Sequence, residues 1–309
     1  MSCGILFYVF TRPGIDFQSL SKAVKDVPFW CFSIAGLLYG AVLLVGCLRW
    51  WILLHSFGIR TKFNLALQLL FIGLFFNNMM PSLTGGDVVK AYYTAQGTSK
   101  KFEAVASILL DRVFGFLAMF ILATIGALLA LKEGVLTRPA EVVLVSTLSF
   151  FLGLLVFLNL GFLRKFSSLR DFFKKWTWME KIQKFYDAFT AIRHNIKAAV
   201  LVFILSLFVQ SLLVIANFVL ARGLGITEIP LKQFFILIPM IGCVSALPVS
   251  FAGWGIGEGA YRTFFMMVNP LYGATAVFLS IFYRLISLGY SLVGFPLSLI
   301  YRKGSIEDG

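Results

Sequence analysis

Two stretches of this sequence combine small polar residues with an acid in otherwise apolar surroundings. The first reads NNMMPSLTGGDVVKAYY (77–93) and the second reads ALPVSFAGWGIGEGAYR (246–262). Each has a proline, a serine and glycines before an acid, Asp87 or Glu258, where a new helix would begin. The amides and the dipole of a helix N-terminus attract anions. The helix start that follows Gly85 and Gly86 could therefore hold a lipid phosphate.

A local ion pair is the alternative role for these two acids. Lys90 follows Asp87 by three residues, and Arg262 follows Glu258 by four. Residues at these spacings meet on one face of a helix, so each acid could satisfy the helix dipole and pair with its neighbour. The sequence leaves open whether Asp87 and Glu258 cap helices or bind a ligand.

Further charges occur some 25 residues after each stretch. Asp111 and Arg112 lie in SILLDRVFG, and Arg284 lies in SIFYRLISLG. Ionised groups within a membrane are unfavourable unless they are paired or solvated, and they commonly mark substrate pathways. Arg284 has no acid within four residues, so its partner is expected to be Asp111, Glu258 or a ligand phosphate. A buried Asp111–Arg284 ion pair between the two halves is the purely structural alternative.

These positions together predict a polar cavity for a phosphate-bearing headgroup. The candidate residues are Ser82, Gly85, Gly86, Asp87, Lys90, Asp111, Arg112, Ser250, Gly253, Gly255, Glu258, Arg262 and Arg284. No catalytic residue, metal ligand or cofactor is predicted. The two histidines lie far apart and the four cysteines include no CxxC, so the sequence indicates neither a zinc site nor a disulfide framework.

The composition identifies a membrane as the surroundings of these residues. Of 309 residues, 59% are hydrophobic and only 13% are charged, whereas about 25% are charged in an ordinary soluble domain. The net charge of +13 does not indicate a nucleic-acid partner, because a soluble basic domain would lack apolar runs such as FLAMFILATIGALLAL (116–131). We therefore predict an all-α polytopic membrane protein.

Runs of roughly 20 apolar residues predict the membrane helices. Full spans are expected near 28–54, 103–131, 140–163, 197–221 and 271–301. The shorter segments 63–80 and 232–247 run into the two polar stretches, and each is expected to form a re-entrant hairpin, giving about seven to eight membrane helices. The apolar residues 3–10 are too few to span a membrane and are interpreted as the end of a truncated first helix.

Charged loops predict the orientation of these elements. Nine Lys or Arg against three acids in 164–197 place that connection in the cytoplasm. Counting from it, the first hairpin enters from the cytoplasmic face and the second from the outer face. Similar motifs entering from opposite faces indicate an inverted repeat in a single transmembrane domain (1–309), with halves 1–163 and 198–309.

The connection 164–197 has apolar residues at helical spacing with lysines between them. We expect it to form an amphipathic helix that contacts anionic lipid at the inner surface of the membrane. Its expected role is anchoring, and substrate recruitment is the alternative.

Four motifs in order resemble a known family. They are NNMMPSLTGGDVVKAYY, AVASILLDRVFGFLA, ALPVSFAGWGIGEGAYR and FYRLISL. This pattern resembles the membrane-domain family named for the lysylphosphatidylglycerol synthase/flippase, over nearly the whole chain. The resemblance implies a bundle of about eight membrane helices, re-entrant ones included, and translocation of a lipid between leaflets. Two-part members add a soluble synthetase domain, which this sequence lacks, so that enzymatic activity is not expected.

The expected function is flippase-like and not enzymatic. The cargo would be a phospholipid, an aminoacylated phospholipid or a polyprenyl-phosphate-linked lipid crossing the cytoplasmic membrane of a bacterium or archaeon. Arg112 and Arg284 would meet the phosphate, while Asp111 and Glu258 would balance them or meet a cationic headgroup. Two alternatives stay open: a membrane glycosyltransferase or other lipid-modifying enzyme, and a non-transporting partner of a lipid-modifying enzyme. The sequence gives no oligomeric state.

Overall fold

The computed structural model describes residues 28–79, 85–132, 134, 137–158, 195–245, 255–301 and 307–308. The helices in these residues are α3 (Phe29–Ser56), α4 (Phe63–Met79), α5 (Gly85–Gly97), α6 (Lys101–Lys132), α7 (Thr137–Leu158), α11 (Ile196–Gly223), α12 (Leu231–Ser245), α13 (Ile256–Val268), η3 (Pro270–Tyr272), α14 (Gly273–Leu292) and α15 (Gly294–Ile300). Two short strands, β1 (Ile59–Arg60) and β2 (Glu307–Asp308), pair antiparallel. The predicted all-α class is confirmed.

Long apolar helices form the frame of the molecule. Four described segments are long and apolar enough to cross a membrane, namely 29–56, 101–132, 196–223 and 270–300. Each coincides with a predicted full span. The fifth predicted span corresponds to α7, which exposes an apolar face that includes Val145, Leu148 and Leu152. Such a face suits contact with lipid tails, because hydrocarbon is the solvent there.

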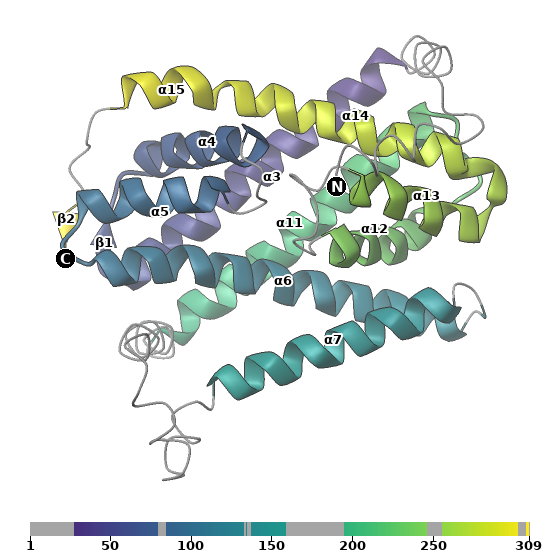
Figure 1. Cartoon of the computed structure of the whole chain (residues 1–309), viewed down its shortest axis with the longest axis horizontal. Helices are drawn as coiled ribbons and strands as arrows, with labels where there is room; N and C mark the ends of the chain where they lie inside the picture. Colours follow the sequence, from purple (N-terminus) through teal and green to yellow (C-terminus); the bar gives the residue numbers. More distant parts are fainter. Residues whose placement is uncertain are drawn as a thin grey trace.

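Two helical hairpins lie within this frame (Figure 1). In the first, α4 packs against α5; in the second, α12 packs against α13. The first hairpin leads into α6 at one end of the molecule, while the second leads through η3 into α14 at the opposite end (Figure 1). This opposite orientation is consistent with the predicted inverted repeat. How deeply each hairpin enters a membrane stays a prediction.

Glycines bring α4 and α5 into backbone contact. A Cβ atom at Gly86 would overlap the carbonyl oxygen of Gly73, so only glycine fits at this crossing. The amide of Gly86 donates a hydrogen bond to Asn77 Oδ1 at 2.8 Å, which satisfies one of the free donors at the N-terminus of α5. Gly86 of the first motif therefore serves close helix packing, and its amide, which was predicted to bind an anion, already has a partner.

The predicted last span, 271–301, is divided into α14 and α15 at Val293. Pro296 lacks the backbone N–H that would continue the helical hydrogen bonds. A Cβ at Gly294 would overlap the carbonyl oxygen of Phe71 in α4. The break in the sequence VGFP thus allows α15 to lie directly against the first hairpin.

Several predictions lie outside the described residues. The amphipathic segment 164–197 is outside them except at its end, where α11 begins at Ile196, and so is the apolar start 3–10. The same holds for three candidate site residues, Ser82, Ser250 and Gly253.

Candidate functional site

Asp87 joins the first hairpin to α6. It lies in the first turn of α5, and its Oδ2 is 2.5 Å from Nε of Arg112. The two side chains are 22% and 37% exposed, respectively, so the pair borders an accessible space. Asp87 was predicted either to pair with Lys90 or to bind a ligand. Its ionic partner is Arg112, because the start of α5 packs against α6 at this level.

Lys90 points into the same region but pairs with neither nearby acid. Its side chain is 7% exposed, and its Nζ lies 3.8 Å from the centre of the Trp50 ring. This is a cation–π contact. Within the part of the chain that the structure describes, Nζ of Lys90 forms no hydrogen bond or ion pair. The predicted Asp87–Lys90 pair is therefore wrong.

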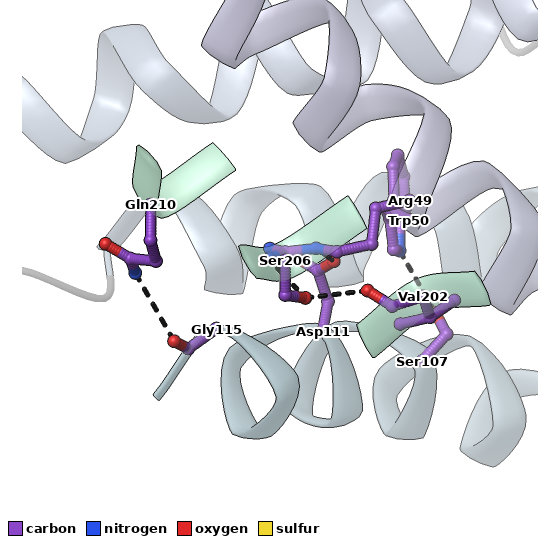
Figure 2. A network of polar contacts seen from close by, with 8 residues as sticks. All are labelled: Arg49, Trp50, Ser107, Asp111, Gly115, Val202, Ser206 and Gln210. Atoms are coloured by element: carbon purple, nitrogen blue, oxygen red, sulfur yellow. Dashed lines mark hydrogen bonds and ion pairs between the residues drawn. The ribbon is translucent and has the colours of Figure 1, made fainter. Parts of the chain in front are cut away.

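Asp111 binds Arg49 of α3 through both carboxylate oxygens (Figure 2). The distances are 2.7 Å from Nε and 3.0 Å from Nη2, a bidentate arrangement that makes strong hydrogen bonds. Nη1 of Arg49 also donates to Oγ of Ser206 in α11 at 3.0 Å. One guanidinium group thus connects three of the long helices.

The predicted Asp111–Arg284 ion pair is wrong, because Asp111 pairs with Arg49 of α3 whereas Arg284 pairs with Glu258 of α13. Sequence reasoning missed Arg49. The signal was present, since this arginine interrupts the apolar run GCLRWWILL inside a predicted span.

Neighbouring bonds hold this network in place (Figure 2). The indole of Trp50 donates to Ser107 Oγ at 3.1 Å, and Gln210 donates to the carbonyl of Gly115 at 3.3 Å. Both bonds cross between helices, the first from α3 to α6 and the second from α11 to α6. They fix the helices whose side chains surround Lys90.

Glu258 has the corresponding position in the second hairpin. Its Oε2 accepts a hydrogen bond from the amide of Gly255 at 2.6 Å, so Glu258 caps α13. Gly255 itself has φ of 88°, a conformation that favours glycine. Oε1 of Glu258 lies 3.3 Å from Nε of Arg284. Glu258 therefore pairs with Arg284 of α14, which confirms one of the partners predicted for Arg284. The alternative pair with Arg262 is wrong, because α14 packs along α13.

Two cavities adjoin these ion pairs. The first has a volume of ≈ 300 Å³. The charged residues in its wall are Arg49, Asp87, Lys90, Asp111 and Arg112. Three cations and two carboxylates give this wall a formal charge of +1. Its surroundings thus favour an anion.

The second cavity has a volume of ≈ 360 Å³ and is lined by Arg284 together with hydroxyl and amide groups. Its polar wall residues are Asn78, Gln210, Asn217, Ser245, Tyr261, Ser280, Tyr283, Arg284 and Ser287. Glu258 lies behind Arg284 and is fully buried. Met119 and Gln210 line both cavities, so the two spaces are neighbours within the helix bundle.

The predicted residues thus divide among different positions. Four line the first cavity: Asp87, Lys90, Asp111 and Arg112. Arg284 lines the second. Gly85 and Gly255 begin or cap helices, and Arg262 is half-buried and lines neither cavity. Asn77 and Gln210 were missed, because an amide in an apolar helix gives a weaker signal than a charge.

Comparisons with known proteins agree with the motif pattern. A family model described as the lysylphosphatidylglycerol synthase TM region matches residues 2–294. A UPF0104 membrane protein from Methanothermobacter thermautotrophicus is 25% identical over 268 residues, covering 79% of this chain and 75% of the relative. No solved structure matches. The chain is a multi-pass integral membrane protein, and it belongs to the lysylphosphatidylglycerol synthase transmembrane-region family.

Proposed function

We propose that this protein moves a phosphate-bearing lipid between the leaflets of the cytoplasmic membrane. The headgroup passes through the first and second cavities, while the tails stay in the surrounding bilayer. The proposed cargo is a phospholipid, an aminoacylated phospholipid or a polyprenyl-phosphate-linked lipid. Membership of the family supports a lipid-related function in the membrane.

One observation carries this proposal: the two polar cavities share wall residues. Met119 and Gln210 line both. Each cavity also borders the second helix of one hairpin, α5 for the first and α13 for the second, and these hairpins lead out towards opposite ends of the molecule (Figure 1). A headgroup that moved past Met119 would therefore pass from the space beside one hairpin to the space beside the other.

The charged residues along such a path would stabilise a lipid headgroup that leaves water. A lipid headgroup is unfavourable in hydrocarbon, because its charge and its hydrogen-bonding groups lose water there. Arg112 in the first cavity and Arg284 in the second offer guanidinium groups along the path. Each arginine also has a carboxylate beside it, Asp87 or Glu258, which limits the unfavourable charge when no cargo is bound.

Transbilayer exchange in reconstituted vesicles tests the proposal. Vesicles contain a fluorescent phosphatidylglycerol, lysyl-phosphatidylglycerol or polyprenyl phosphate, and a reductant that cannot cross the bilayer bleaches the outer leaflet. We expect the protein to make the inner-leaflet label accessible for at least one of these lipids. Exchange equal to that of protein-free vesicles for the whole panel contradicts the proposal.

We further propose that the lipid is not changed covalently. Mass spectrometry of the same vesicles checks this point. A lipid product with a new mass would instead support the enzyme alternative, for which Asp87 and Glu258 are the acids available beside the two cavities.

A further inference from the structure

Lys90 lies in the wall of the first cavity with an aromatic ring as its neighbour. Trp50 beneath it is fully buried and is held by its hydrogen bond to Ser107, so the ring is a fixed platform. The ammonium group has three N–H donors, and a ring face does not replace three hydrogen-bond acceptors. Because Lys90 borders the cavity, its N–H donors are available to oxygen acceptors of an occupant.

The other charges of the first cavity are already matched. Arg49 binds Asp111, and Arg112 binds Asp87. Lys90 is therefore the source of the formal +1 charge of the wall. An occupant with one negative charge would make the cavity neutral.

We infer that Lys90 is the primary ligand for a singly charged lipid phosphodiester in the first cavity, with Arg49 and Arg112 adding positive potential around it. Phosphate oxygens are strong acceptors for ammonium donors. A lipid is the expected source of the phosphate, because the cavity lies among helices with apolar, exposed outer faces. This inference rests on the proposed function for the presence of a headgroup in the cavity, but binding can be measured without transport.

The second cavity differs from the first in the charge of its wall. Its arginine, Arg284, lies beside Glu258, so this pair contributes no net charge. The remaining polar wall groups are hydroxyls and amides, such as Ser280 and Asn217, which donate and accept hydrogen bonds without charge. The first cavity should therefore bind the anion more tightly than the second. The second cavity should bind a headgroup only weakly as it crosses the membrane.

Binding of short-chain lipids to the purified full-length protein tests this site. In uncharged detergent, calorimetry compares dioctanoyl-phosphatidylglycerol, dioctanoylglycerol and inorganic phosphate. We expect phosphatidylglycerol to bind at least tenfold more tightly than either of the others. Equal affinity for dioctanoylglycerol overturns the anion site, and equal affinity for inorganic phosphate overturns the lipid source.

The variant Lys90→Met tests the residue. Methionine preserves the length and the contact with Trp50 while removing the charge, so the fold should persist. We expect at least a tenfold loss of phosphatidylglycerol affinity with unchanged dioctanoylglycerol binding. Lys101→Met, at an exposed position on α6, is the matched control and should bind like the wild type. Wild-type affinity in Lys90→Met overturns the inference.

The outcomes separate this inference from the proposed function. Lys90-dependent binding without transbilayer exchange supports the site and removes the transport proposal. Exchange and phosphatidylglycerol binding that are both unaffected by Lys90→Met leave transport standing and remove the site.

Discussion

Asp87 and Arg112 form an ion pair that links the second helix of the first hairpin to the helix that follows it. The second half repeats this arrangement, since Glu258 in the first turn of α13 contacts Arg284 in α14. In both halves the acid begins a hairpin helix and the arginine comes from the next long helix. The shared motif of the two halves is therefore a tertiary contact between helices.

The ion pairs of the first cavity should differ in their importance for stability. Asp111→Asn leaves Arg49, whose side chain is only 11% exposed, without its carboxylate, and removing one member of a buried pair costs about 3–5 kcal/mol. Asp87→Asn leaves Arg112, which is 37% exposed and can be hydrated, so its effect should be about 1 kcal/mol or less. Thermal unfolding in detergent should show the larger loss for Asp111→Asn.

A double variant is the control for this prediction. Arg49→Met combined with Asp111→Leu replaces the buried charges by apolar groups and should recover stability relative to Asp111→Asn alone. A melting temperature for Asp87→Asn as low as that of Asp111→Asn would contradict the assigned burial.

The two single variants of the Glu258–Arg284 pair should differ in melting temperature. Arg284→Gln leaves a carboxylate that is fully buried, whereas Glu258→Gln leaves an arginine that borders the second cavity. The glutamine of Glu258→Gln can still accept the hydrogen bond from Gly255. Arg284→Gln should therefore lower the melting temperature more. The double variant should lie above Arg284→Gln, and the reverse order of the single variants would show that Glu258 is not the more buried charge.

The positions of the long helices were predictable from the sequence, because they depend on the length of apolar runs. The contacts between side chains of different helices were not predictable. Runs of apolar residues located the long helices, and glycines located the starts of α5 and α13, because both signals are local. The partners of Asp111 and Arg284 depend on how helices rotate and pack. Arg49 and Asp111 are separated by 62 residues, so no local spacing rule reveals their contact.

The break at Gly294 is a second feature that depends on packing between helices and not on a local signal alone. Hydropathy is continuous through α14 and α15, so a window of apolar residues reads them as one helix. Pro296 was a local signal for a break. The reason that the break is placed there is the close approach of Gly294 to α4, which only the tertiary structure shows.

The contact of Gly86 with Gly73 predicts a strong effect of a single methyl group. Gly86→Ala should separate α4 from α5, because the added Cβ would overlap a backbone carbonyl that cannot move independently. We expect a loss of folded protein on purification and a lower melting temperature. Gly46→Ala in α3 is the matched control, since a Cβ there meets nothing within 4 Å and alanine favours a helix by about 1 kcal/mol over glycine. Equal stability of the two variants would contradict the close crossing.

A substitution at Met119 tests whether a headgroup passes from one cavity to the other. Its side chain lines both and is 7% exposed, and a Cβ at Gly242 would lie 2.9 Å from its sulfur. Methionine is flexible and can move aside, whereas a tryptophan at this position would fill the passage. Met119→Trp should reduce transbilayer exchange at least tenfold, while a single symmetric elution peak and a melting temperature close to that of the wild type show that the variant is folded. Leu128→Trp, on the exposed face of the same helix, should exchange like the wild type. Unchanged exchange in Met119→Trp would mean that the headgroup does not cross between the cavities at Met119.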